Sequence, residues 1–171
     1  MKKLPSVRLQ FLGWAGVLVV GLILPACGAT HSTLRVNTPP TAPLGQYKSV
    51  QIQCTSEDEK AQEFTGRLES QVMVKLKERD TFQEYFLSKD ACKPELVVKV
   101  TILDLKKASA VAVGWYTRNT SKVNCDVVVQ DTKTNDPVTS FSVVAKPKYS
   151  SIEQAIDDAA TQIADFLREH K

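Results

Sequence analysis

Apolar and polar residues alternate in four stretches of the chain and recur at helical spacing in two others. The alternation predicts strands over residues 49–54, 95–105, 121–130 and 138–146. Apolar residues three or four positions apart predict helices over residues 57–79 and 151–171. A Ser-x-x-Glu capping box begins at Ser56 before the first helix and at Ser150 before the second.

The predicted element order is β-α-β-β-β-α. A strand-helix-strand unit favours a right-handed parallel crossover, and the later strands favour a meander. Each helix has one apolar stripe and one charged face, so both are expected on the same side of the sheet. The sequence therefore predicts an α+β two-layer sandwich, with a mixed sheet and two helices on one face. Val97, Leu103 and Leu105 add apolar surface to the opposite face, which otherwise stays open to partners.

The first 26 residues have the organisation of a secretory signal. Three basic residues and no acid precede residues 11–24, FLGWAGVLVVGLIL. This uncharged run is shorter than the roughly 20 apolar residues of a membrane span. It ends in Leu24-Pro25-Ala26-Cys27, which resembles the bacterial lipobox.

The lipobox resemblance implies a lipid anchor. In that family the chain is cut before the cysteine, here Cys27, whose thiol and new amino terminus carry acyl chains. Gly28 resembles the residue after the cysteine in outer-membrane lipoproteins. The protein is therefore expected at the periplasmic face of the outer membrane. The N-terminal lipid would hold it there, because several acyl chains anchor a protein stably. A plain signal peptide cut nearby, or an uncleaved anchor, is the alternative.

Residues 27–46 are expected to form a flexible tether, followed by a periplasmic α+β domain over residues 47–171. The tether contains three prolines and little apolar surface, so its burial would not offset the entropy of ordering it. The alternative is an edge strand that packs on the domain through Leu34 and Val36.

The charge balance argues against nucleic acid as a partner. Without the three basic residues of the signal, 19 Lys and Arg side chains face 19 Asp and Glu side chains, so no excess positive charge remains. His31 and His170 lack neighbours with metal-ligand spacing, and no phosphate-binding glycine loop occurs. No serine has an evident base partner, so neither catalysis nor a cofactor is expected.

Three cysteines remain if Cys27 is lipidated. Cys54 and Cys125 both point inward and lie towards one end of the predicted sheet, so they are the favoured pair for a disulfide, which the periplasm permits. The alternatives are three thiols, Cys92 included, or a bond between two molecules.

Residues 108–116, ASAVAVGWY, connect two predicted strands and form the candidate interaction hairpin. At a hairpin tip, its apolar side chains and the following arginine suit contacts with a protein or a membrane interface; they are Val111, Val113, Trp115, Tyr116 and Arg118. The alternative is that longer strands use these residues to cover one end of the core.

The same region carries a wider resemblance, to the lipoprotein family known as domain of unknown function 4410. That family has a glycine turn, a Lys-Val-x-x-x-Val-x-Val-x-Asp strand, a further turn, a strand and a terminal helix. The matching residues are Gly114, Lys122, Val123, Val127, Val129, Asp131 and Thr134. The likeness spans roughly residues 47–169; a more distant one is to the periplasmic domain of the curli secretion lipoprotein. Neither implies a reaction.

These observations favour a non-catalytic binding or assembly module of the cell envelope, with an envelope protein of unknown identity as its partner. The alternative is a carrier for a small apolar ligand or a lipid, with a pocket between the sheet and the helices. A hydrolase is the least favoured class.

Overall fold

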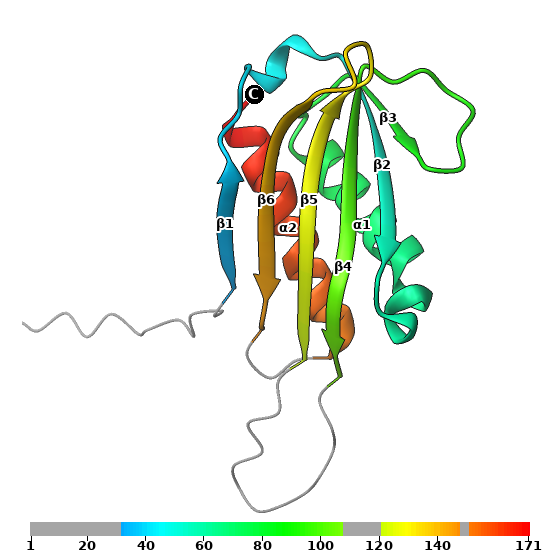
Figure 1. Cartoon of the computed structure of the whole chain (residues 1–171). Coiled ribbons are helices and arrows are strands. Elements are labelled where there is room, and N and C mark those ends of the chain that lie inside the picture. The colour runs from blue at the N-terminus through cyan, green and yellow to red at the C-terminus, as the bar shows by residue number, and fades with distance from the viewer. Residues whose placement is uncertain (1–31, 108–120, 148–150) are drawn as a thin grey trace, which may run out of the picture.

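A computed structural model describes residues 32–107, 121–147 and 151–171. This part of the chain contains one six-stranded mixed sheet with the order β1-β6-β5-β4-β2-β3 (Figure 1). The strands are β1 (Thr33–Thr38), β2 (Ser49–Ser56), β3 (Glu84–Leu87), β4 (Leu96–Lys106), β5 (Lys122–Asp131) and β6 (Pro137–Ala145). The helices are α1 (Thr65–Glu78) and α2 (Ile152–Glu169), with short 3₁₀ helices at Leu44–Gln46 and Glu59–Phe64.

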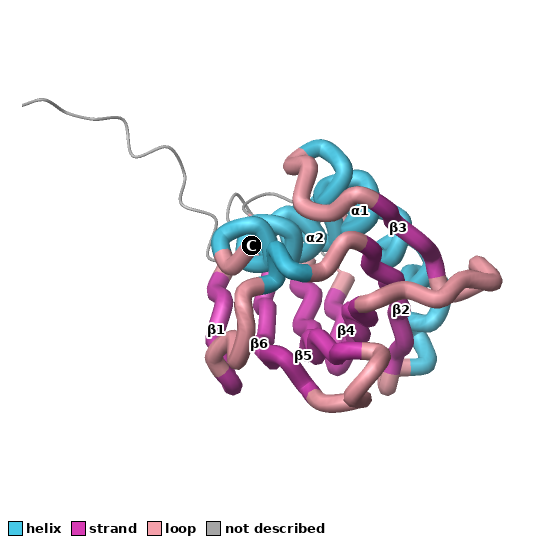
Figure 2. The backbone as a smooth tube through the Cα atoms, turned by 90° about the horizontal axis from the view of Figure 1, so that it is seen from above, coloured by secondary structure: helices cyan, strands magenta, loops and turns pink. Residues whose placement is uncertain are grey.

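The predicted α+β architecture is confirmed. β2 and β4 are parallel, with α1 between them in sequence, and β4, β5 and β6 form the antiparallel meander. α1 packs on β2 and α2 packs on β5 and β6, so both helices lie on one side of the sheet (Figure 2). Within the described residues, no helix covers the opposite face of the central strands.

The core lies between this sheet and the two helices. Side chains at every second position of the central strands are fully buried against α1 and α2. Phe141 of β6 stacks against Phe166 of α2, with ring centroids 4.1 Å apart. Burial of this apolar surface is the main favourable contribution to folding.

A β-bulge changes the predicted position of Leu105. The register between β4 and β5 shifts between Ile102 and Asp104. The extra residue restores Leu105 to the helix-covered side, where it is 7% exposed. The expectation that Leu105 faces the opposite side is therefore wrong.

The first helix begins later than the sequence predicted. Glu59–Phe64 is a 3₁₀ helix, and its N-cap is Asp58, whose carboxylate accepts a bond from the Lys60 N–H at 2.9 Å. Ser56 instead donates its hydroxyl to the Asp58 carbonyl at 2.8 Å, so it closes the preceding turn. The N-cap of α2 lies one residue after the predicted box, at Ser151, whose hydroxyl accepts a bond from the Gln154 N–H.

Part of the segment predicted as a tether belongs to the folded domain. β1 pairs with β6 as an antiparallel edge strand, with Leu34 beside Val143. Further on, Leu44 is fully buried and its N–H bonds the His170 carbonyl at 2.8 Å. The edge-strand alternative therefore holds for Thr33–Thr38; residues 27–31 lie outside the described part of the chain.

A second edge strand, β3, follows α1 and pairs with β2 in parallel. The Tyr85 hydroxyl accepts a bond from the Phe82 N–H at 2.9 Å and donates one to the Leu76 carbonyl at 3.2 Å. These bonds join β3 to the end of α1. The sequence pattern did not predict this strand.

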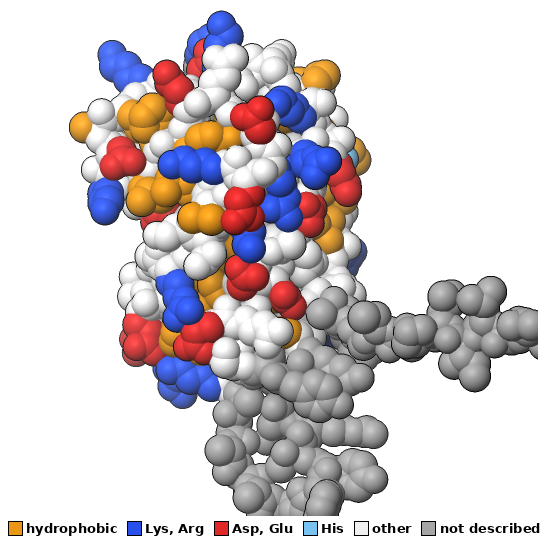
Figure 3. Space-filling model, turned by 180° about the vertical axis from the view of Figure 1, so that it is seen from behind, with side chains coloured by type: hydrophobic (Ala, Val, Ile, Leu, Met, Phe, Trp, Pro, Cys, Tyr) orange, Lys and Arg blue, Asp and Glu red, His pale blue; other side chains and the backbone are white. Residues whose placement is uncertain are grey.

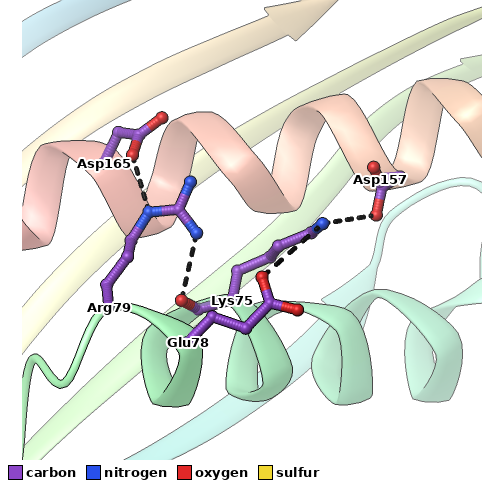
Figure 4. Close-up of polar contacts among 5 residues, drawn as sticks. All are labelled: Lys75, Glu78, Arg79, Asp157 and Asp165. Carbon is purple, nitrogen blue, oxygen red and sulfur yellow. Dashed lines mark hydrogen bonds and ion pairs between the residues drawn. The ribbon is translucent and has the colours of Figure 1, made fainter.

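Ion pairs connect the two helices on their solvent side. Lys75 contacts Asp157 at 3.2 Å, and Arg79 contacts Asp165 at 2.6 Å (Figure 4). Basic and acidic side chains are intermixed over this side of the molecule, as Figure 3 shows. The charged face predicted for each helix therefore faces solvent and the neighbouring helix.

Candidate interaction surface

The helix-free side of the sheet presents a continuous polar surface, which we call the open face. One row of side chains in register crosses five strands, from β1 to β2. Its members are Arg35, Ser142, Asp126, Thr101 and Thr55. Because the pleat alternates, these residues are the outward neighbours of the buried core positions.

Hydrogen bonds link short side chains within this row. Ser142 donates to the Asp126 carboxylate at 2.7 Å and accepts a bond from the Asn37 amide at 3.0 Å. Thr55 and Thr101 hydroxyls lie 3.4 Å apart. The next row towards the β5–β6 turn contains Lys99 and Val128 side by side, and Val128 is 37% exposed. A surface of this kind suits contact with another protein better than enclosure of a small molecule.

A shallow hollow of about 240 Å³ lies on the open face beside the β5–β6 turn. It is lined by Gln53, Val97, Lys99, Gln130, Asp131, Thr132 and Asn135. The Lys133 backbone N–H and the Tyr47 hydroxyl donate to Asp131 and lower the pKa of its carboxyl group. These bonds hold the turn in place, with Asn135 in the left-handed region at φ 63°.

The two edge strands of the sheet, β1 and β3, differ in how far their outward backbone groups are bonded or covered. At β3, the Leu87 N–H donates to the Asp90 carboxylate at 2.7 Å, which occupies one edge donor. β1 is exposed over nearly its whole length, and Val36 is 42% exposed. An edge strand with this exposure is a natural site for contact with a further strand. The sequence signal for it was short, because only Leu34 and Val36 supply apolar positions in β1.

The remaining predicted site residues lie outside the described part of the chain. These are the lipidation residue Cys27 and the candidate hairpin residues Val111, Val113, Trp115, Tyr116 and Arg118. Their flanks are described: Lys107 follows the end of β4, and Ser121 precedes β5. The hairpin and the anchor therefore stay predictions.

The disulfide predicted between Cys54 and Cys125 is wrong for this structure, in which both are free thiols. Cys54 lies on β2 and Cys125 on β5, with β4 between them. Two strand spacings amount to about 10 Å, beyond the roughly 7 Å between Cα atoms that a disulfide allows. Burial raises the pKa of Cys54 to about 12 and raises that of Cys125 as well.

His170, for which the sequence predicts no metal-ligand neighbours, has a structural role, as do two acidic side chains of the helices. The His170 ring packs on Phe166, and its Nδ1 lies 2.8 Å from the Phe166 carbonyl oxygen. Asp58 caps a helix and Asp157 pairs with Lys75. Within residues 32–107, 121–147 and 151–171, no group of three or more His, Cys, Asp or Glu side chains could hold a metal ion.

No helix of the described residues is both long enough and apolar enough to cross a membrane. A hollow near the end of β4 is lined mainly by charged and polar side chains of the 3₁₀ helix Glu59–Phe64 and by Lys107. This lining offers little to an apolar ligand.

Comparisons with known proteins show likeness in fold. No protein-family model matches the sequence, and no curated protein matches it. The PelC dodecamer from Paraburkholderia phytofirmans is similar with a TM-score of 0.63 at 12% identity, over 80% of this chain and 97% of that one. Protein XCC0632 from Xanthomonas campestris, of family DUF330, has a TM-score of 0.54 at 12% identity, over 80% of this chain and 90% of that one. The chain therefore shares its fold with these two proteins, and identities of 12% show likeness in fold alone.

Proposed function

We propose that the protein is a non-catalytic lipoprotein of the outer membrane that faces the periplasm and binds or assembles with other envelope proteins. The observation that carries this proposal is the open face, a largely polar surface across five strands that no helix of the described residues covers. The lipobox ending at Cys27 supports the anchor. The resemblance to the domain of unknown function 4410 family belongs to the same proposal.

The anchor has its own test. Mass spectrometry of the protein isolated from bacterial membranes is expected to show an N-terminal Cys27 that carries three acyl chains. Cys27→Ser should leave the precursor uncleaved and without lipid. An unmodified Cys27, or an amino terminus elsewhere, would contradict both the proposed location and the envelope role.

The kind of partner is suggested by the fold comparison. PelC was crystallised as a dodecamer, so a second copy of this chain is the first partner to test. The exposed edge of β1 lies beside the open face and extends the surface available to such a partner. The candidate hairpin around Trp115 is a further contribution to this interface.

Site-specific photo-crosslinking in intact cells tests the open face. A photoreactive residue at Lys99, exposed on β4, is compared with one at Lys77, exposed on α1. We expect discrete adducts from position 99 and none from position 77, with a mass of twice the chain where the partner is a second copy. Equal adducts at both positions, or none at position 99, would contradict the proposal. Trp115→Ala should weaken the adduct where the hairpin contributes.

The carrier hypothesis has less support. The hollow near the end of β4 and the hollow beside the β5–β6 turn are lined mainly by charged and polar side chains, whereas an apolar ligand needs an apolar lining. Saturable binding of a fluorescent fatty acid to the purified protein, with displacement of the fatty acid by lipid, would favour the carrier instead.

A further inference from the structure

Four strands start or end at one end of the sheet. Thr33, the first residue of β1 and the strand residue nearest to Cys27 in sequence, lies at this end. Thr33 begins β1 beside Val144 of β6, and Lys106 at the end of β4 pairs with Lys122 at the start of β5. We call this the anchor end; it lies at the bottom of Figure 1. The opposite, distal end carries the β5–β6 turn and the start of β4.

The length of chain before β1 limits where the domain can sit. Thr33 is six residues after Cys27, so the connection reaches at most about 20 Å when fully extended. β4 has 11 residues and is therefore about 35 Å long. If the strands stand upright, the distal end cannot be the one at the bilayer surface, because Thr33 would then lie farther from the lipid than the connection allows.

Basic and acidic side chains lie together at the anchor end, where the 3₁₀ helix Glu59–Phe64 and Asp104 supply carboxylates and the strand ends supply lysines. Each of the three central strands has a lysine at this end: Lys106 of β4, Lys122 of β5 and Lys146, which follows β6. Lys106 and Lys122 share Asp104, at 4.0 and 3.3 Å. Lysine stems are long enough to extend the ammonium group to lipid phosphates while the chain stays outside the bilayer.

We infer that the anchor end faces the bilayer, with the strands upright and their ammonium groups towards the lipid phosphates. This inference rests on the proposed lipidation of Cys27. Upright strands direct the open face and the β1 edge sideways, parallel to the membrane. Both surfaces are then presented to other proteins held in the same membrane, and the distal turn points into the periplasm.

Headgroup quenching measures the orientation directly. The lipidated protein, with Cys92→Ser to remove the least buried of the three described thiols, receives single cysteines at Lys106, Lys99 or Lys133. These positions lie at the anchor end, midway along β4 and in the distal turn. Each variant is labelled with an environment-insensitive fluorophore and reconstituted into phospholipid vesicles that carry a nitroxide on the headgroup. Cys54 and Cys125 should stay unlabelled, because burial raises the pKa of both thiols.

We expect quenching several-fold stronger at position 106 than at position 133, with position 99 between them. Equal quenching at all three positions would mean that the domain lies flat, and a reversed order would mean that it is inverted; either result overturns the inference while the lipid anchor stands. Mass spectrometry of the same samples reports the lipid separately. If Cys27 carries no lipid and the protein does not float with vesicles, the proposed function fails and this orientation fails with it.

Discussion

The two faces of the sheet are built from the same strands and yet have opposite chemistry. On β6, Phe141 is fully buried under α2, whereas its neighbour Ser140 faces the helix-free side. On β5, Val127 is fully buried and Val128 is 37% exposed. Apolar burial on one face supplies the stability of the domain, so the residues of the other face are free to serve recognition. Alternation along a single strand thus places the core residues on one face and the residues proposed for binding on the other.

The sharpest way to test this division is a pair of substitutions on one strand. Phe141→Ala removes a fully buried ring that stacks on Phe166 at 4.1 Å, and should lower the free energy of unfolding by about 3–5 kcal/mol. Ser140→Ala, one residue away on the open face, should change it by less than about 0.5 kcal/mol. Urea unfolding followed by circular dichroism measures both. Similar losses for the two variants would mean that the open face also contributes to stability.

A buried carboxylate tests whether polar groups on the helix side contribute to the free energy of unfolding when they are removed from solvent. Glu69 of α1 is 7% exposed and accepts bonds from the Ser88 N–H at 2.5 Å and the Ser88 hydroxyl at 3.2 Å. Glu69→Ala leaves that N–H without its acceptor and should cost about 1–3 kcal/mol. Glu63→Ala is the control, because the Glu63–Lys107 pair is exposed on both sides and should contribute little. A loss at Glu63 as large as at Glu69 would contradict the role of burial.

The thiol of Cys54 gives the helix side a dependence on pH. Burial, followed by the charge of Glu69, raises its pKa to about 12, above the roughly 8.5 of an unfolded cysteine. The unfolded state therefore loses this proton first, and stability that is complete below about pH 8.5 falls by up to ~1.4 kcal/mol per pH unit until about pH 12. Cys54→Ala should reduce that slope in urea unfolding at pH 8.5 to 10.5. An unchanged slope would show that this thiol does not titrate as its burial implies.

The elements that the sequence predicted well are those whose pattern is local. β4 alternates over most of its length, and α2 has an apolar stripe behind a serine N-cap, so both could be located from neighbouring residues. β1 has only two apolar positions, Leu34 and Val36, and the pairing joins it to residues more than 100 positions later. A strand whose existence depends on a distant edge leaves little trace in its own sequence.

The predicted disulfide failed for a related reason. Alternation correctly places Cys54 and Cys125 on the inner face, since Cys125 is fully buried and Cys54 packs against the core. Which strand lies between them depends on sheet order, and order comes from tertiary packing rather than from any local pattern. The same limit applies to the open face: the sequence indicates that it exists, but the row from Arg35 to Thr55 appears only when five strands are in register.

The smallest expected effect concerns the charges between the helices. Arg79 bonds Asp165 at 2.6 Å and also donates to the Lys75 carbonyl at 3.1 Å, but the Asp165 side chain is 48% exposed (Figure 4). Solvent screens such a pair, so the coupling in a double-mutant cycle of Arg79→Ala and Asp165→Ala should be below about 1 kcal/mol and should fall further at high salt. A coupling above about 2 kcal/mol that salt leaves unchanged would make the ion pairs part of the stabilising side of the molecule. The expected small value would instead restrict that role to the apolar layer beneath them, because only the groups removed from water distinguish one face of this sheet from the other.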